Sequence, residues 1–197
     1  MRTRCLAVAI LLASPVAAAA EWHIKPFVGL TFGGGTRFVD SENAVGKPNP
    51  VFGVTGLLLG NVLGIEGDVG RAPGFFESGG QKLLLGSRVT TLTGNVVVAL
   101  PKRMAEYSLR PYFVSGVGLM HVNIEGRLGG LNVSSTLPAV DFGGGATGFL
   151  SDRVGLNWEV RHFGSLGEGK IRGVSVNGGE QLSFWRATMA VTIRYGK

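Results

Sequence analysis

The sequence predicts an all-β fold: an antiparallel, up-and-down transmembrane β-barrel of about eight strands. After residue 20, apolar residues alternate with polar or small ones at a period of two, the pattern of a strand with two different faces. Long and short connections alternate between these segments. Glycine accounts for 33 of the 197 residues, well above the usual share of roughly 7 %, and follows no Gly-X-Y repeat. These observations favour a membrane-spanning sheet over a helical or collagen-like chain.

The first residues are typical of a secretory signal peptide. Arg2 and Arg4 supply positive charge, and an apolar run from Leu6 to Val16 is followed by small alanines. We therefore expect a cleaved signal peptide at residues 1–20 and one barrel domain at residues 21–197. An uncleaved anchor is the weaker alternative, because the apolar run is short for a helical span of roughly 20 residues.

Cysteine and charge exclude several classes of site. The only cysteine, Cys5, lies in the expected signal, so we expect no disulfide and no thiolate metal site in the mature chain. Cys5 also precedes the apolar run, so we expect no lipid anchor. Loss of Arg2 and Arg4 leaves 17 basic against 13 acidic residues, a net charge of +4. The basic residues are dispersed along an exported chain, so we expect no nucleic-acid partner.

The period-two alternation places the strands. The last segment is the clearest, with Trp185 and Tyr195 on one face and Arg186 and Arg194 on the other. Its length suits the roughly 9–11 residues that cross a bilayer at a tilt. Pro26 removes a ladder hydrogen bond from the first segment, so we expect a bulge or a poorly paired position there. The expected strands are Trp22–Phe32, Val51–Gly60, Gly64–Gly70, Thr90–Leu100, Leu109–Glu125, Val140–Leu150, Val154–Gly164 and Trp185–Tyr195.

The lengths of the connections predict an orientation. Transmembrane barrels have long loops outside and short turns on the periplasmic side. An even number of strands then places both termini in the periplasm. The expected long loops are Gly34–Pro50, Arg71–Lys82, Gly126–Pro138 and Ser165–Gln181, and the shorter connections are Asn61–Leu63, Pro101–Ser108 and Ser151–Arg153.

Charged residues on the polar strand faces predict the contents of the barrel. An eight-stranded barrel is only wide enough for side chains to fill it, and buried charges are tolerated there when they are paired. We therefore expect a lumen plugged by ion pairs. By parity Lys25, Glu125 and Asp141 also point into the lumen, but they lie near strand ends, where we expect them in water at the rims. The expected lumen network is Glu66, Asp68, Glu159, Arg161, Arg186 and Arg194.

Aromatic residues predict the position of the lipid interfaces. Outer-membrane barrels carry aromatic girdles on the lipid-facing wall near the strand ends. On Leu109–Glu125 we expect Tyr112, Val114, Met120 and Val122 toward lipid and His121 and Asn123 toward the lumen. The expected girdle is Trp22, Tyr112, Trp158, Trp185 and Tyr195.

Three stretches resemble the OmpA-like, opacity-type family of outer-membrane β-barrels. They are Leu63-Gly-Ile-Glu-Gly-Asp-Val-Gly70, Arg110-Pro-Tyr-Phe-Val-Ser-Gly-Val-Gly118 and Gly143-Gly-Gly-Ala-Thr-Gly-Phe-Leu-Ser-Asp-Arg-Val-Gly155. Their order and spacing cover most of the mature chain. The resemblance implies an eight-stranded barrel of the bacterial outer membrane, which in many members of the family has no catalytic activity and often no known ligand. The chain departs from the family in ending with Tyr195-Gly196-Lys197 rather than on the aromatic residue itself.

Two motifs could carry chemistry. Residues 143–148 match the spacing G-x-G-x-x-G, but a nucleotide site requires a helix to start there. A lipid hydrolase would need serine, histidine and an acid on one lipid-facing patch. His162 faces lipid by parity, whereas Ser165 has the opposite parity, and Glu159 and Glu168 are uncertain partners. No metal-ligand spacing appears, and we expect no cofactor.

We therefore expect a non-enzymatic outer-membrane protein with a structural or surface-interaction role. A narrow channel for small solutes is the alternative, and an outer-membrane lipid hydrolase is the third hypothesis. The expected partners are outer-membrane lipids and lipopolysaccharide, the outer-membrane assembly machinery and an extracellular partner of the long loops. We expect a monomer.

Overall fold

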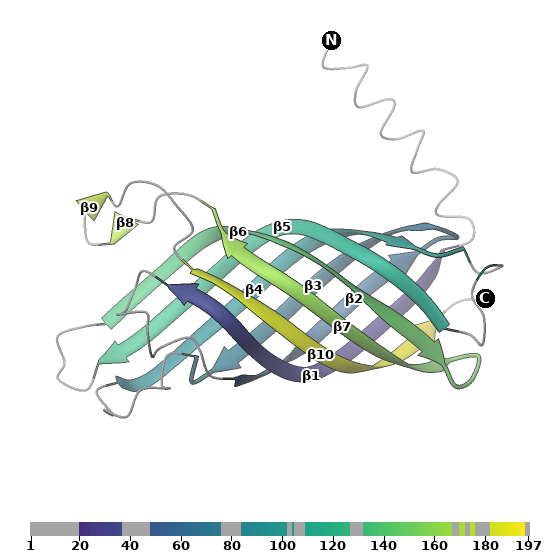
Figure 1. Ribbon diagram of the computed structural model, residues 1–197, viewed down its shortest axis with the longest axis horizontal. Helices are drawn as coiled ribbons and strands as arrows, with labels where there is room; N and C mark the ends of the chain where they lie inside the picture. The colour runs from purple at the N-terminus through teal and green to yellow at the C-terminus, as the bar shows by residue number, and fades with distance from the viewer. Residues whose placement is uncertain are drawn as a thin grey trace, which may run out of the picture.

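Long antiparallel strands close into a barrel in the computed structural model of the chain (Figure 1). The structure describes residues 20–36, 48–75, 84–101, 104, 109–126, 132–166, 170–171, 174–175 and 182–195. The barrel strands are β1 (Glu21–Thr36), β2 (Asn49–Leu59), β3 (Leu63–Pro73), β4 (Leu84–Ala99), β5 (Leu109–Gly126), β6 (Asn132–Phe149), β7 (Val154–Ser165) and β10 (Leu182–Tyr195). Two-residue strands β8 (Lys170–Ile171) and β9 (Val174–Ser175) pair with each other between β7 and β10. Among these residues, no helix is long and apolar enough to cross a membrane.

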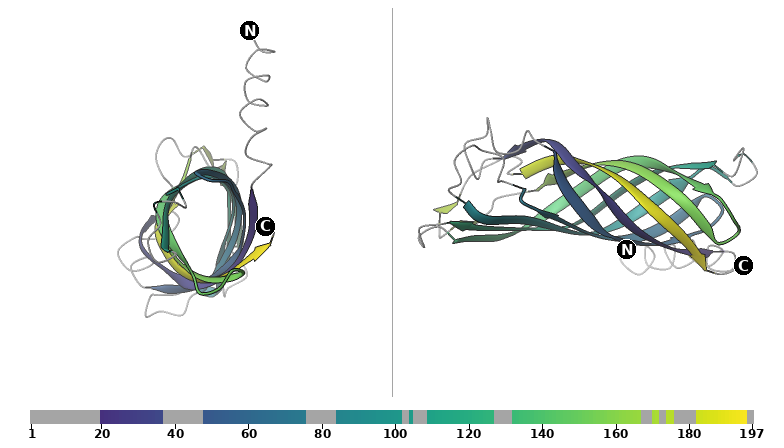
Figure 2. Two further views of the ribbon diagram at one scale, coloured as in Figure 1. Left: turned by 90° about the vertical axis from the view of Figure 1, so that its right-hand side faces the viewer. Right: turned by 90° about the horizontal axis from the view of Figure 1, so that it is seen from below.

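The barrel closes between the first and the last of its strands. Each barrel strand pairs with its neighbours in the chain, and β1 also pairs with β10, where Trp22 lies opposite Tyr195. The closed ring is seen along its axis in Figure 2. The start of β1, the end of β10 and the β6–β7 hairpin lie at the same end (Figure 1). The predicted fold class, an eight-stranded antiparallel barrel, is therefore confirmed for the described residues.

Several strands are longer than the sequence predicted. β1 runs to Thr36, and β6 begins at Asn132 rather than Val140, so much of the predicted loop Gly126–Pro138 is strand. The prediction was wrong there because Ser134, Ser135 and Thr136 are polar, whereas their backbones pair with β5 all the same. Pro26 has a partner on β2 and none among the β10 register pairs, as expected of a poorly paired position.

The two faces of each strand differ in exposure. On β3, Ile65 is 63 % exposed and its neighbour Glu66 is 5 % exposed. On β5 the predicted faces were reversed, because Val114 and Met120 are fully buried and Val117 is 65 % exposed. Apart from its polar end, this strand is apolar on both faces. The alternation in its sequence therefore did not indicate which face points toward lipid.

Two apolar clusters lie inside the barrel at different heights. The first, near the end that holds the strand termini, contains Leu57, Leu59, Val97, Ala99 and Val114. The second lies toward the opposite end, where Phe184 stacks on Phe163 and meets Phe75 edge to face, with ring centroids 5.3 and 5.0 Å apart. Its members are Phe27, Val51, Ala72, Phe75, Val89, Met120, Val122, Ala139, Phe163, Leu182, Phe184 and Ala190.

Inward-facing glycines leave the space that long neighbouring side chains occupy. A Cβ on Gly143 would collide with the Val160 carbonyl and lie 2.7 Å from the Arg161 Cα. A Cβ on Gly70 would lie 2.7 Å from an Arg186 guanidinium nitrogen. Gly67 faces outward, and a Cβ there would meet nothing within 4 Å.

This difference predicts opposite effects of alanine at two glycines. We expect Gly143→Ala to lower the free energy of unfolding by about 1–3 kcal/mol, because the new methyl group meets backbone that cannot move aside. Gly67→Ala is the matched control, and we expect it to be neutral or to stabilise by up to about 1 kcal/mol. Urea unfolding in lipid vesicles measures both, and equal effects would contradict the packing role of Gly143.

Candidate functional site: a charged belt inside the barrel

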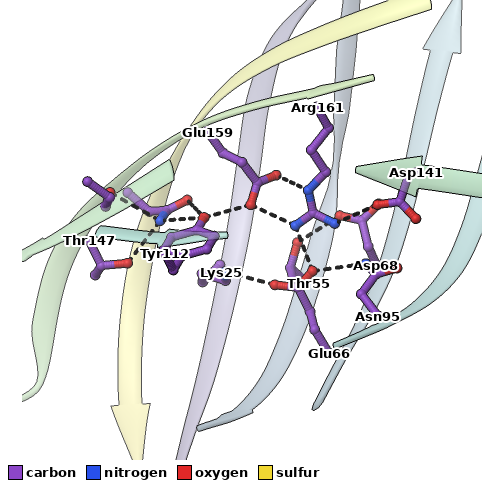
Figure 3. Close-up of polar contacts among 12 residues, drawn as sticks. Lys25, Thr55, Glu66, Asp68, Asn95, Tyr112, Asp141, Thr147, Glu159 and Arg161 are labelled. Atoms are coloured by element: carbon purple, nitrogen blue, oxygen red, sulfur yellow. Dashed lines mark hydrogen bonds and ion pairs between the residues drawn. The ribbon is translucent and has the colours of Figure 1, made fainter. Parts of the chain in front are cut away.

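Between the two apolar clusters, charged side chains from five strands (β1, β3, β6, β7 and β10) meet inside the barrel. Figure 3 shows those from β1, β3, β6 and β7. Each is buried, with a relative exposure of at most 6 %. We call this group the charged belt, and its members are Lys25, Glu66, Asp68, Asp141, Glu159, Arg161 and Arg186.

Arg161 is the centre of the belt and is completely buried. Its Nη2 donates to Glu66 Oε1 and to Glu159 Oε2, each at 2.6 Å. Its Nε donates to Glu159 Oε1, and its Nη1 donates to Asp141 Oδ2 at 3.3 Å. One guanidinium therefore joins carboxylates from β3, β6 and β7, and charge-assisted bonds of this kind are the strong ones.

Arg186 forms the second centre. Its two terminal nitrogens donate to the two oxygens of Asp68, each at 2.9 Å. The guanidinium also lies over the rings of Phe27 and Phe163, 4.7 and 4.6 Å from their centroids. Thr55 Oγ1 donates to Asp68 at 2.9 Å. The pair is thus held by fork geometry and by aromatic faces that suit a cation.

Lys25 and Asn95 complete the surroundings of Glu66. Lys25 Nζ donates to Glu66 Oε2 at 3.1 Å, and Asn95 Nδ2 donates to Oε1 at 3.0 Å. Lys25 and Asp141 point inward as their parity predicts, but the expectation that they lie in water at the rims is wrong, because they are 2 % and 1 % exposed. It overlooked Asn95, although Asn95 shares an alternating polar face with Thr93 on β4.

Tyr112 lies inside the barrel, so its assignment to the lipid-facing girdle was wrong. Its hydroxyl donates to Glu159 Oε2 at 2.6 Å, and Asn157 Nδ2 donates to the hydroxyl oxygen at 3.0 Å. The Lys25 ammonium lies 5.1 Å from the centroid of its ring. The error follows from the reversed faces of β5.

Arg194 does not join the belt. Its guanidinium lies 3.6 Å from Glu21, donates to the Asp152 carbonyl at 2.6 Å and covers the Phe149 ring. Of the six charged residues expected in the lumen network, the structure brings together the other five: Glu66, Asp68, Glu159, Arg161 and Arg186. Glu125 has no described side-chain position.

The remaining aromatic residues of the expected girdle face outward. Trp22 and Tyr195 are opposite each other at the end of the barrel that holds the strand termini. Trp185 lies in contact with the His162 ring, with centroids 5.0 Å apart. Trp22, Trp158, Trp185 and Tyr195 are 57, 43, 36 and 53 % exposed, respectively.

The residues considered for chemistry are not assembled into a site. His162 is on the outer wall between Phe142 and Trp185, whereas Ser165 is buried and its Oγ accepts a hydrogen bond from the Leu182 amide. Glu168 lies outside the described residues. Residues 143–148 belong to β6, and no helix starts there as a nucleotide site would require. The described part of the chain holds no group of three His, Cys, Asp or Glu residues placed to bind a metal.

A closed barrel with an apolar outer wall and a charged interior defines the class of β-barrel proteins of the bacterial outer membrane. Residues 5–184 match the family described as outer membrane protein beta-barrel domain, and the chain belongs to that family. The resemblance to OmpA-like barrels is thereby confirmed. The expected signal peptide at residues 1–20 lies almost wholly outside the described residues.

Solved structures share the same fold. Neisserial surface protein A (NspA) is 11 % identical with a TM-score of 0.64, over 89 % of this chain and 97 % of that one. The N-terminal β-barrel domain of Pseudomonas aeruginosa OprF is 11 % identical with a TM-score of 0.58, over 90 % and 98 %. Pseudomonas aeruginosa OprG is 12 % identical with a TM-score of 0.54, over 91 % and 97 %. No curated protein matches the chain.

The Arg186–Asp68 pair predicts a strong dependence of each residue on the other. We expect Arg186→Met to lower the free energy of unfolding by about 3–5 kcal/mol, because Asp68 is left as a buried, unpaired charge. Adding Asp68→Asn removes that charge and keeps a partner for Thr55, so the double variant recovers most of the loss. The more exposed Arg194 serves as the control, and Arg194→Met costs about 0–1 kcal/mol. Urea unfolding in vesicles measures all three, and a double variant less stable than Arg186→Met would contradict the pairing.

Proposed function

We propose that this protein is a non-enzymatic barrel of the outer membrane with a closed lumen and a structural or surface-interaction role. The observation that carries the proposal is the charged belt between two apolar clusters. A general diffusion channel needs a continuous water-filled lumen, and this arrangement of side chains opposes one.

The pairing within the belt supports a closed lumen. Lys25, Arg161 and Arg186 each lie within 3.1 Å of a carboxylate oxygen. An eight-stranded barrel is only just wide enough for its own side chains. Charges that are paired in this way are held by one another and by the strands, and they do not line a path for solutes.

A narrow channel is the second candidate. Thr91, Thr93 and Thr192 are buried inside the barrel, and their hydroxyl oxygens have no hydrogen-bond partner among the described residues. Buried polar groups of this kind commonly bind water. A file of small solutes along β4 would use the hydroxyls of Thr91 and Thr93, and it would have to pass the belt.

The outer loops are the place where we propose the surface role. The short connections at Gly60–Val62 and Ser151–Arg153 lie at the end where the barrel begins and finishes. By the rule that short turns are periplasmic, both termini are periplasmic and the long connections face the exterior. Rigid scaffolds present such loops to partners. We also propose lipopolysaccharide, outer-membrane lipids and the assembly machinery as partners of a monomeric barrel.

The separation of His162 and Ser165 supports a non-enzymatic role. They project from opposite faces of β7, one to the outer wall and one to the interior. A serine hydrolase needs both within hydrogen-bond reach. The lipid hydrolase hypothesis therefore has no assembled residues behind it in the described part of the chain.

A closed lumen predicts that the barrel does not conduct ions. We expect the folded barrel to give no steady openings in planar bilayers, because the belt and the apolar clusters block the path. Steady openings whose conductance changes in Glu66→Gln or Arg161→Lys would contradict the closed lumen and favour the channel. Arg153→Ala, at the exposed turn outside the barrel, is the control for effects of surface charge.

The proposed orientation predicts which connections are reached from outside the cell. A protease site inserted between β8 and β9 should be cut in intact cells by added protease. The same site inserted into the turn Ser151–Arg153 should be cut only after the outer membrane is permeabilised. The reverse pattern would overturn the periplasmic placement of the termini.

A further inference from the structure

The charged belt contains one more acidic group than basic groups. Its three basic members are Lys25, Arg161 and Arg186, and its four acidic members are Glu66, Asp68, Asp141 and Glu159. With every acid ionised, three positive and four negative charges would give the belt a net charge of −1. An uncompensated charge in a closed interior is very costly, and a carboxyl group can avoid that cost by becoming neutral.

Three of the four acids have hydrogen bonds on both carboxylate oxygens, and Asp141 does not. Glu66, Asp68 and Glu159 each accept three bonds from side chains of the barrel. Asp141 Oδ2 accepts the 3.3 Å bond from Arg161, whereas Oδ1 is buried and has no hydrogen-bond partner among the described residues. Asp141 is therefore the acid whose negative charge the surroundings support least.

A second unpartnered acceptor lies beside Asp141. Asn95 donates to Glu66 through Nδ2, which fixes the orientation of its amide, and its Oδ1 is buried without a partner among the described residues. The register places Gly116 of β5 between Asn95 on β4 and Asp141 on β6. A Cβ on Gly116 would collide with Asn95 Oδ1, so this oxygen extends over the glycine toward β6. Opposite Cβ positions on neighbouring strands lie about 4.5–5.5 Å apart, which places the same space within reach of the Asp141 carboxyl group.

Two neighbouring acceptors can form a hydrogen bond only when a proton is added. A protonated carboxyl group has one O–H donor and still accepts through its other oxygen. With a proton on Oδ1, Asp141 can donate to Asn95 Oδ1 while Oδ2 still accepts from Arg161. A single proton thus provides partners for both oxygens and cancels the excess charge of the belt.

We propose that the belt binds one proton at neutral pH, on Oδ1 of Asp141, and that this O–H group donates a hydrogen bond to Asn95 Oδ1. The proton is taken from water when the barrel forms. The inference depends on the belt alone, and the surface role and the orientation given under Proposed function do not enter it. The charged groups around the proton, on β1, β3, β7 and β10, are Lys25, Glu66, Asp68, Glu159, Arg161 and Arg186.

A proton fits this place better than a metal cation or a water molecule. Ca²⁺ and Mg²⁺ take about six oxygen ligands or more. The described side chains of β4 and β6 offer four unpartnered oxygens along the barrel, from Thr91, Thr93, Asn95 and Asp141. A water molecule could donate to both Asn95 and Asp141, but it would leave the excess negative charge in place.

Infrared spectroscopy of the full-length folded barrel in lipid vesicles tests the proposal. At neutral pH we expect the carbonyl stretching band of a protonated carboxyl group, which moves when the aspartates carry heavy carbon. Asp141→Asn should remove this band. Asn95→Leu should shift it to higher frequency, because the carboxyl group loses its hydrogen-bond acceptor. Asp152→Asn is the matched control at an exposed aspartate and should leave the band unchanged.

Stability gives an independent measurement. Asparagine at 141 can donate to Asn95 and accept from Arg161 as the neutral acid does, so we expect Asp141→Asn to keep the urea midpoint of the wild-type barrel. Asp141→Ala leaves both partners unsatisfied and should lower the midpoint. Heat-dependent gel mobility shows that each variant is folded.

Four results would overturn the proposal. They are the absence of the band in the wild-type protein, its persistence in Asp141→Asn, a midpoint of Asp141→Asn as low as that of Asp141→Ala, and a band that appears only when sodium is replaced by the bulky cation N-methylglucamine. The last result would assign the site to a metal cation.

Discussion

The rest of the interior depends on the guanidinium of Arg161. An isolated buried charge is very costly, and an eight-stranded barrel leaves little room for water to solvate one. The charge of Arg161 is not isolated, because its guanidinium binds the carboxyl groups of Glu66, Asp141 and Glu159 at the same time. Lys25 can then share Glu66, and Tyr112 can donate to Glu159. Removing the central cation would leave each of these carboxylates exposed to the others' charge.

The same constraint explains the glycines of the inner wall. Long arginine side chains need room that a Cβ on the adjacent strand would occupy, as at Gly143 beside Arg161 and Gly70 beside Arg186. The belt and these glycines are therefore two parts of one packing solution. On the outside, the side chains in the middle of the wall are apolar, and the wall becomes polar where β4, β5 and β6 continue beyond the apolar rows.

The alternation in the sequence predicted the barrel and much of the belt. The position of a residue in the alternation assigns it to one face of a strand, whatever its position along the barrel axis. Glu66, Asp68, Glu159, Arg161 and Arg186 follow from it directly. Parity fails where both faces are alike, as around Tyr112 on β5. Parity also does not give the position of a residue along the barrel axis. The distance of Lys25 and Asp141 from the predicted strand ends therefore did not show that they lie in the middle of the barrel. The start of β6 was missed because backbone pairing does not depend on the polarity of Ser134 to Thr136.

The belt also constrains how the barrel forms. Arg161 and Glu66 are 95 residues apart in the chain, and Arg186 and Asp68 are 118 apart. Within the ring β7 and β3 are not neighbours, so these partners meet across the interior only when the sheet has curled and joined. Before the sheet closes, each of these charged groups is unpaired and must remain hydrated. A sheet that has not closed cannot bury its charged inner face in the membrane, because the charges on that face are still unpaired. The ion pairs of the belt therefore favour insertion of closed barrels over open sheets.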